Sequence, residues 1–242
     1  MSLILAYSEK VFALENSLDV LEKQRAASFR FVHLSEQYTF AHAFKRRVLS
    51  HYFPHNKASE WRFDRTPSGK PFISENIAFN LSHSADSVAV AFVESRDKCA
   101  VGVDIERYKD MEDLESMIDM VCHPDERRQL DLCRHRQESF FQLWTAKEAL
   151  LKANGSGLID NLSQINCVPS LVNGTSYDLP WQGDQYCLKS FCFSWGVISI
   201  AWLETLRVSD IKLVDWTSGE PVTEVYRISE SSSDCHASSN EW

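Results

Sequence analysis

The order of the expected elements constrains this fold more than any other feature, because a strand, helices and several further strands follow one another twice. In the first half, a strand at residues 3–7 precedes helices at about 17–27 and 35–53, as judged from apolar periodicity. In the second half, a strand at 100–105 precedes three helical segments. We therefore predict an α+β fold made of two pseudo-symmetric α/β halves.

Short strands bounded by turn residues complete each half. They are expected at 61–64, 77–81, 88–93 and 99–106, and again at 162–168, 185–193, 197–203 and 211–216. The helical segments of the second half are 112–120, 124–133 and 137–154. Gly155 stands where a left-handed cap would end the last of these helices.

The two halves also share a local string, because residues 88–95 resemble 198–205 at every position except Ala89 against Ser199. Strands resemble one another easily, so eight positions are weak support alone, but the element order recurs around them. We expect an N-terminal half at 1–98, a C-terminal half at 99–228, and a disordered Ser-rich tail at 229–242.

Composition excludes several classes of protein. An apolar share of 44% is enough for a core, and a net charge of −9 gives no bulk attraction to nucleic acid or anionic lipid. No stretch approaches the roughly 18 apolar residues of a spanning helix, and no signal-peptide pattern is present. We expect a cytoplasmic protein with neither a nucleic-acid nor a membrane partner. The seven cysteines include no C-x-x-C pair, which favours reduced thiols over zinc ligands or disulfides.

The charge is unevenly distributed. Residues 23–70 carry ten Lys or Arg against three acids, whereas 104–131 carry ten acids against four Lys or Arg. A basic and an acidic segment in one compact chain would suit an anionic ligand bridged to a metal ion. Two solvated helix faces would explain the same counts.

Two acidic or mixed-charge motifs are candidates for chemistry. In the strand at 102–106, Asp104 and Glu106 share one face, roughly 6–7 Å apart. Carboxylates without His or Cys select Mg²⁺ or Mn²⁺, although solvated acids at a strand end would look the same.

On the longest helix, a spacing of four aligns Trp144, Glu148 and Lys152. This face would offer a third carboxylate beside an ammonium, or only a core aromatic and a helix ion pair.

Two turn motifs complete the set. Residues 80–84, Asn-Leu-Ser-His-Ser, offer hydroxyls and an imidazole at a strand end that could receive a phosphate, although a lone His in a turn is often structural. Residues 69–71, Gly-Lys-Pro, by themselves predict only a tight turn.

The four motifs together, in this order, resemble the 4′-phosphopantetheinyl transferase superfamily of the surfactin-synthetase-activating (Sfp) type. The strings are G-K-P, N-L-S-H-S, G-V-D-I-E and F-x-x-L-W-T-A-K-E-A-L-L-K-A-N-G-x-G-L. The likeness runs by motif from about Arg25 to Leu158, and to about residue 216 only by architecture. It implies the fold of that family, with an active site at the interface of the two halves.

The resemblance also implies an activity. Such an enzyme moves the phosphopantetheine arm of coenzyme A to a serine of an apo acyl, peptidyl or polyketide carrier protein and releases 3′,5′-ADP. This holo-[acyl-carrier-protein] synthase reaction activates carriers of fatty acid, polyketide and nonribosomal peptide biosynthesis. It requires Mg²⁺, for which Mn²⁺ could substitute.

The family pattern assigns roles to residues of this chain. By resemblance, the metal ligands are Asp104, Glu106 and Glu148, and the catalytic residues are Glu148 and Lys152. Lys152 would neutralise the pyrophosphate, and Glu148 would take the proton of the carrier serine, directly or through a metal-bound water. Coenzyme A would be bound by Arg46, Ser82 and His83 at its 3′-phosphate and by Gly69, Lys70 and Pro71 around its adenine.

Several points stay open at this stage. Glu126 would be either an acid near the site or a stabiliser of a helix N-terminus, and Arg25 and Arg30 are further candidates for the 3′-phosphate. A carrier that is itself acidic would need a local basic or apolar patch on this acidic protein. A monomer suffices to build one site, so we expect a monomer. The alternatives are a non-catalytic coenzyme A-binding relative and an unrelated magnesium-dependent nucleotide hydrolase, the latter disfavoured because no Walker-type string is present.

Overall fold

The structure is a computed structural model that describes residues 1–12, 14, 17–97, 100–155, 157, 162–172 and 175–228. The predicted disordered tail and the predicted boundary at residues 98 and 99 lie outside this range. Among the helices in this range, none has the length and apolar character needed to cross a membrane.

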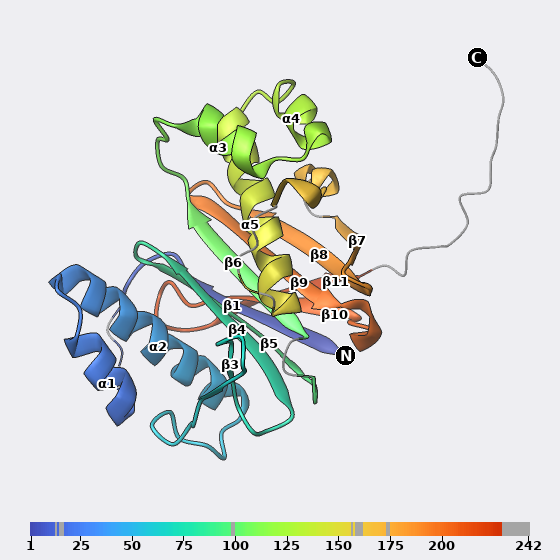
Figure 1. The fold of residues 1–242 in the computed structure, drawn as a ribbon. Coiled ribbons are helices and arrows are strands. Elements are labelled where there is room, and N and C mark those ends of the chain that lie inside the picture. Colours follow the sequence, from blue (N-terminus) through green and yellow to red (C-terminus); the bar gives the residue numbers. More distant parts are fainter. Residues whose placement is uncertain are drawn as a thin grey trace.

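Two sheets form the centre of the molecule (Figure 1). The first has the strand order β11-β10-β1-β5-β4, and its strands are β1 (Ser2–Ser8), β4 (Ile77–Ser84), β5 (Ser87–Glu94), β10 (Asp210–Asp215) and β11 (Val222–Arg227). The second has the order β6-β9-β8-β7, with β6 (Val101–Arg107), β7 (Ser176–Trp181), β8 (Asp184–Cys192) and β9 (Gly196–Leu203). A short ribbon pairs β2 (Asp64–Arg65) with β3 (Pro71–Phe72).

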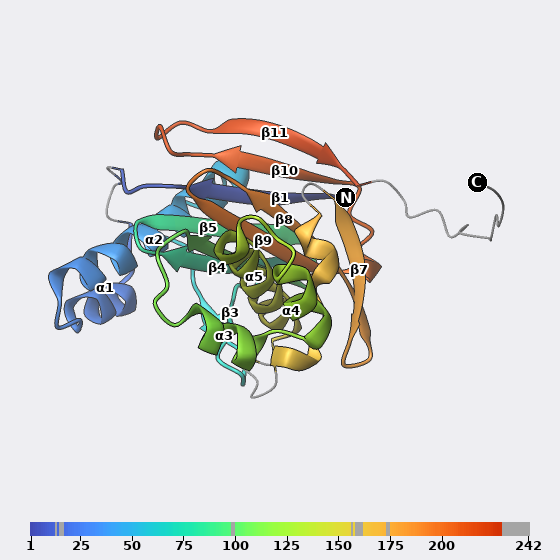
Figure 2. The same ribbon diagram turned by 90° about the horizontal axis from the view of Figure 1, so that it is seen from above.

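Helices cover the outer faces of both sheets, as Figures 1 and 2 show. The helices are α1 (Val20–Ala27), α2 (Val32–Tyr52), α3 (Leu114–Val121), α4 (Pro124–Leu130) and α5 (Arg136–Asn154). One core lies between the two sheets, a second joins α2 to the first sheet, and a third joins α3, α4 and α5 to the second sheet. The order of layers is therefore helix, sheet, sheet, helix.

The two halves repeat one topology, and the predicted mixed α and β fold is confirmed. In the first half β1 pairs antiparallel with β5, and β5 with β4; in the second, β6 pairs antiparallel with β9, and β9 with β8. The similar strings at 88–95 and 198–205 lie largely on β5 and β9, which are equivalent strands. The repeat in sequence thus corresponds to a repeat in structure.

Several boundaries differ from the prediction. The segment at 162–168 forms short 3₁₀ turns rather than a strand, and β7 and β11 were not predicted. The cap of α1 is Asp19, which forms a capping box with Glu22, because this pair can satisfy two backbone N–H groups at once. The strand expected at 211–216 is β10, and it joins the first sheet by pairing in parallel with β1. Gly155 ends α5 with φ 77°, as predicted.

Candidate active site

A glycine allows α5 to lie directly against β6. Alternate residues of β6 enter the core between the sheets, so Gly102, Asp104 and Glu106 share the other face. A Cβ atom at Gly102 would overlap backbone atoms of Ala149 and Ala153 in α5. Only glycine permits this approach, which places the functional face of α5 beside the two carboxylates of β6.

Three elements meet at Asp104. Lys152 Nζ of α5 lies 2.6 Å from Asp104 Oδ1, and Ser82 of β4 donates its hydroxyl to the same oxygen at 2.8 Å. Lys152 also donates to Ser82 Oγ at 3.0 Å. Two residues further along β4 and β6, the Ser84 hydroxyl donates a hydrogen bond to Glu106 Oε2 at 2.6 Å. Residues from three of the four sequence motifs are therefore in direct contact.

The carboxylates of this cluster carry more negative charge than their neighbours offset. Burial raises the pKa of Glu148, and the charges of Asp104 and Glu106 raise it further against the opposing effect of Lys152. Burial also raises the pKa of Glu106, where the hydrogen bond from Ser84 opposes the shift. Two buried oxygens, Asp104 Oδ2 and Glu148 Oε1, have no hydrogen-bond partner among the described residues. Such atoms are costly to bury unless a ligand satisfies them.

The donor set suits a hard divalent cation, since it contains only carboxylate oxygens. Because no hydrogen-bond donor among the described residues offsets the charge of these two oxygens, they would attract such an ion electrostatically. Within the described ranges, no group of three or more His, Cys, Asp or Glu side chains is arranged closely enough to hold a metal ion. The carboxylates of Asp104, Glu106 and Glu148 thus fit Mg²⁺ by donor chemistry, but their arrangement in this structure does not bring all three within reach of one ion.

The Gly-Lys-Pro turn lies at the C-terminal end of α5. Gly69 has φ 87°, a conformation that favours glycine. Lys70 Nζ donates to the carbonyl oxygens of Val101 at 2.9 Å and Lys152 at 2.6 Å, so its side chain ties the turn to β6 and α5. A cavity of about 240 Å³ adjoins this junction. Its walls are Ser68, Gly69, Lys70, Pro71, Asn80, Leu151, Lys152, Gly155 and Gly157.

His83 follows Ser82 near the end of β4. The packing around the imidazole and the positive charge of Lys152 lower its pKa. An anion beside this ring would favour protonation. His83 is exposed, and the period of two along β4 places it on the opposite face from Ser82.

Comparison with known proteins finds similar sequences. Residues 100–197 match the profile of the 4′-phosphopantetheinyl transferase superfamily. Over this segment the chain is similar to that superfamily. The 4′-phosphopantetheinyl transferase HetI of Nostoc is 32% identical over 147 residues, which cover 57% of this chain and 59% of that protein. The 4′-phosphopantetheinyl transferase ffp of Bacillus subtilis is 36% identical over 118 residues, covering 47% and 49%. The chain spans about half the length of the curated relatives it matches.

Arg46 does not fit the 3′-phosphate role that the superfamily pattern implies for it. The residue is 0% exposed, and its guanidinium donates to Glu22 at 2.7 Å and Asp19 at 2.8 Å. It also donates to the carbonyl oxygens of Ala58 and Trp61. With its donors directed into the protein, Arg46 joins α1 to α2 and to the segment that follows α2. The sequence expectation is corrected here, because burial and partners cannot be read from the residue type.

Glu126 is a structural residue of the superfamily domain. It is 0% exposed, forms a capping box with His123, and lies 2.6 Å from Lys147 Nζ. Its other carboxylate oxygen accepts a hydrogen bond from the Cys167 backbone at 2.6 Å. Of the two alternatives left open by the sequence, stabilisation of a helix N-terminus is the one that the structure favours.

Asn80 and Ser84 belong to the Asn-Leu-Ser-His-Ser motif, but the sequence analysis assigned neither of them an individual role. Asn80 accepts a hydrogen bond from the Val103 backbone at 2.9 Å and lines the cavity near the Gly-Lys-Pro turn. Ser84 holds Glu106. The signal that could have found them is the period of two along β4, because Asn80, Ser82 and Ser84 share the face that meets β6.

Proposed function

We propose that this protein transfers the 4′-phosphopantetheine arm of coenzyme A to a serine of an apo acyl, peptidyl or polyketide carrier protein and releases 3′,5′-ADP. The observation that carries the proposal is the pair of buried, partnerless oxygens of Asp104 and Glu148 beside Lys152. A bound cation would offset the charge of the carboxylates, and an anionic substrate would offset the charges of the cation and of Lys152. The superfamily match over 100–197 supports the same reaction.

Coenzyme A would lie along the junction of the two halves. The backbone of Gly69, Lys70 and Pro71 would flank the adenine, in keeping with a Lys70 side chain that points into the protein. Ser82 and His83 would contact the 3′-phosphate. In this proposal the half at 1–98 supplies these contacts, and the half at 99–228 supplies the metal and catalytic residues.

Transfer would proceed in one displacement. The carrier serine Oγ forms a bond to the β-phosphorus, and the bond from that phosphorus to the bridging oxygen breaks, so this oxygen leaves on 3′,5′-ADP. Glu148 would accept the serine proton, directly or through a metal-bound water. Lys152 would stabilise the negative charge that develops on the leaving group.

Asp104, Glu106 and Glu148 would hold Mg²⁺, or Mn²⁺ in its place. When bound, the ion would offset the carboxylate charge and stabilise the negative charge of the pyrophosphate. Ser82 and Ser84 orient two of these ligands through the hydrogen bonds described above, as outer partners of metal ligands commonly do. A monomer is sufficient for this chemistry, and a cytoplasmic location stays a prediction.

The test is the intact mass of several apo carrier proteins after incubation with this protein, coenzyme A and Mg²⁺. We expect a gain of one phosphopantetheine arm that disappears with a chelator and with Glu148→Ala. Coenzyme A binding without any gain would instead indicate a non-catalytic binder. Breakdown of coenzyme A without a carrier would indicate a hydrolase.

A further inference from the structure

The edge strand β11 is an exposed element that the proposed chemistry does not use. It lies outside residues 100–197, which match the superfamily profile, and its only strand partner among the described residues is β10. Figure 2 shows β11 as the outermost strand of the first sheet, with no other labelled element beyond it. Val222 is 63% exposed and Val225 59%. The free edge of such a strand can pair with another strand.

The backbone of β11 directs hydrogen-bonding groups to this free edge. The Ile228 N–H donates to the Ser209 carbonyl oxygen at 2.9 Å, which continues the ladder between β10 and β11. In an antiparallel ladder every second residue bonds to the same neighbour. The N–H and C=O groups of Thr223, Val225 and Arg227 therefore point away from β10. Such groups need a partner, either water or another strand.

The sequence of β11 contains little that would prevent pairing at this edge. Proteins commonly block a strand edge with a proline, a lysine or a bulge. β11 is the six-residue string Val-Thr-Glu-Val-Tyr-Arg, which contains neither proline nor lysine and pairs with β10 without interruption. Most of its residues are β-branched or aromatic, types that favour strands. The strand is therefore suited to accept a further strand.

β11 is compatible with a second copy of itself. In an antiparallel pair about a two-fold axis, Val225 can lie opposite its own copy, with Thr223 opposite Arg227 and Glu224 opposite Tyr226. This register opposes no like charges. A register centred on Glu224 would instead place two carboxylates opposite each other, which is unfavourable. The charges of the strand thus select the register centred on Val225.

The packing of Tyr226 shows which side of the sheet the Val225 pair would occupy. The Tyr226 ring lies 5.1 Å from the Phe191 ring, measured between centroids, and packs against the core between the two sheets. Because side chains alternate along a strand, Thr223, Val225 and Arg227 lie on the opposite face. The central apolar contact of the pair would therefore form on the face that points away from the second sheet.

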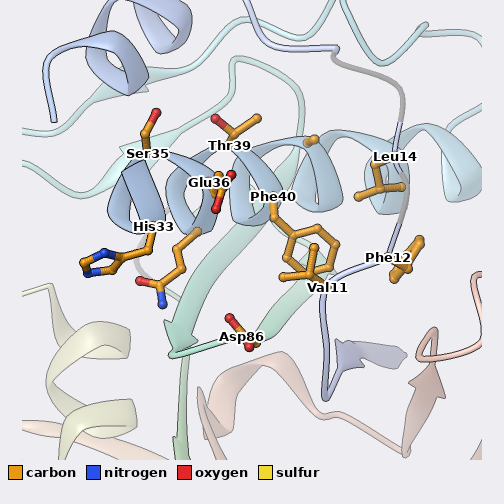
Figure 3. A pocket seen from close by; sticks show the side chains of 11 residues that line it. Val11, Phe12, Leu14, His33, Ser35, Glu36, Thr39, Phe40 and Asp86 are labelled. Atoms are coloured by element: carbon orange, nitrogen blue, oxygen red, sulfur yellow. The ribbon is translucent and has the colours of Figure 1, made fainter. Parts of the chain in front are cut away.

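The cavity beside α2 is a less suitable place for a second copy. It has a volume of about 600 Å³, and Figure 3 shows Glu36 on α2 with Asp86 across from it. Two copies meeting there would bring acidic side chains together in a protein whose net charge is −9. β11 has one acid and one base, Glu224 and Arg227, so self-association at its edge meets less repulsion.

We propose that two copies of this chain associate through their β11 edges and join their first sheets into one continuous sheet. Hydrogen bonds at Thr223, Val225 and Arg227 would fix the register, and the Val225 pair would add apolar contact at the centre. The inference goes beyond the proposed function, because β11 and β4 lie at opposite edges of the first sheet and each chain builds its own site. Since the contact is one strand wide, the Kd should be about 10 µM.

The test compares full chains by sedimentation velocity at concentrations between about 1 and 200 µM. Val225→Lys places two ammonium groups at the centre of the pair, and Val225→Glu places two carboxylates there. Both variants should stay folded, because the side chain is exposed, and thermal unfolding checks this. The matched control is Val172→Lys, at a valine that is 61% exposed beside the 3₁₀ turn 168–171 of the second half.

We expect a wild-type dimer, an unaffected control, and association at least about tenfold weaker in Val225→Lys and in Val225→Glu alone. An equimolar mixture of these two variants should dimerise again, because an ammonium group would then face a carboxylate. A monomeric wild type over the whole range, an unchanged dimer in both variants, an equal loss in the control or a mixture that stays monomeric would overturn the inference. A dimer that forms only in a chain ending at residue 228 would also overturn it, and would assign the edge to residues 229–242.

Discussion

Two buried charge clusters in this protein differ in how completely their charges are matched. The α1–α2 cluster pairs Asp19 and Glu22 with Lys45 and Arg46 at 2.7–3.0 Å. In the carboxylate cluster, Asp104, Glu106 and Glu148 share the ion-pair partner Lys152, and two of their oxygens have no hydrogen-bond partner among the residues that the structure describes. The first is balanced within the chain, and the second needs a ligand to become so.

The pKa shifts follow the same contrast. Burial acts to raise the pKa of Glu22, but the hydrogen bond with His42 and the charges of Lys45 and Arg46 together lower it well below its ordinary value. In the carboxylate cluster, burial and neighbouring carboxylates raise the pKa of Glu106 and Glu148. A cluster that stabilises its own charges supports the fold, whereas a cluster that destabilises them marks a functional site.

The largest expected effect is the loss of transfer in Asp104→Ala. The substitution removes a carboxylate with a partnerless buried oxygen, so transfer should fall by about a thousandfold or more, while the protein stays folded. The checks are the kcat/KM of carrier modification and thermal unfolding. Full activity in this variant would refute the metal assignment.

In the α1–α2 cluster, a substitution should reduce stability rather than catalysis. Arg46→Ala leaves the buried Glu22 and the half-buried Asp19 without their shared partner, so the free energy of unfolding should fall by about 3 kcal/mol or more. Urea unfolding with coenzyme A calorimetry on the remaining folded protein separates the two roles. A stable variant with selectively weakened coenzyme A binding would show that Arg46 binds the 3′-phosphate, and it would contradict the contrast between the two charge clusters.

A smaller loss of stability is expected from a substitution at Gly102, where β6 packs against α5 beside the carboxylate cluster. Gly102→Ala pushes a methyl group against the backbone of α5, so stability should decrease by about 2 kcal/mol and transfer should decrease as α5 moves away from β6. Gly219→Ala serves as a comparison, since its φ of 89° strains the backbone without displacing α5. Equal activity in the two variants would show that this packing does not position the site.

The smallest effect is a gain in stability. The ordinary carboxyl pKa is 4.5, and the fold raises it at Glu106 and Glu148. The folded state therefore binds these protons more tightly than the unfolded chain, and this stabilisation is present below pH 4.5 and lost as pH rises through the raised values. Glu148→Gln should raise the Tm by about 2 °C at pH 7, with no gain at pH 4.

Added Mg²⁺ provides the matching control for this prediction. It should raise the Tm of the wild type at pH 7 and have less effect on Glu148→Gln, because the amide supplies a weaker ligand. A lower Tm in the amide variant at pH 7 would show that the carboxylate cluster is already balanced.

The motifs were predictable from the sequence because they depend on local periodicity. A period of two placed Asp104 and Glu106 on one face of β6, and a spacing of four aligned Glu148 with Lys152 on α5. The repeated order of strands and helices likewise predicted two related halves. These relations span a few residues or follow the chain direction, so no long-range contact is needed to infer them.

Tertiary structure decided the relations between distant segments. The partner of Arg46 lies 24 residues away on α1, and the partner of β1 is β10, more than 200 residues later. Whether an arginine faces a ligand or a buried glutamate depends on how two helices pack, and which strand completes a sheet depends on which edge is free. Such choices are set by burial and the pairing of backbone groups across the whole chain, so the sequence supplied the chemical groups and the packing determined which of them remained available for function.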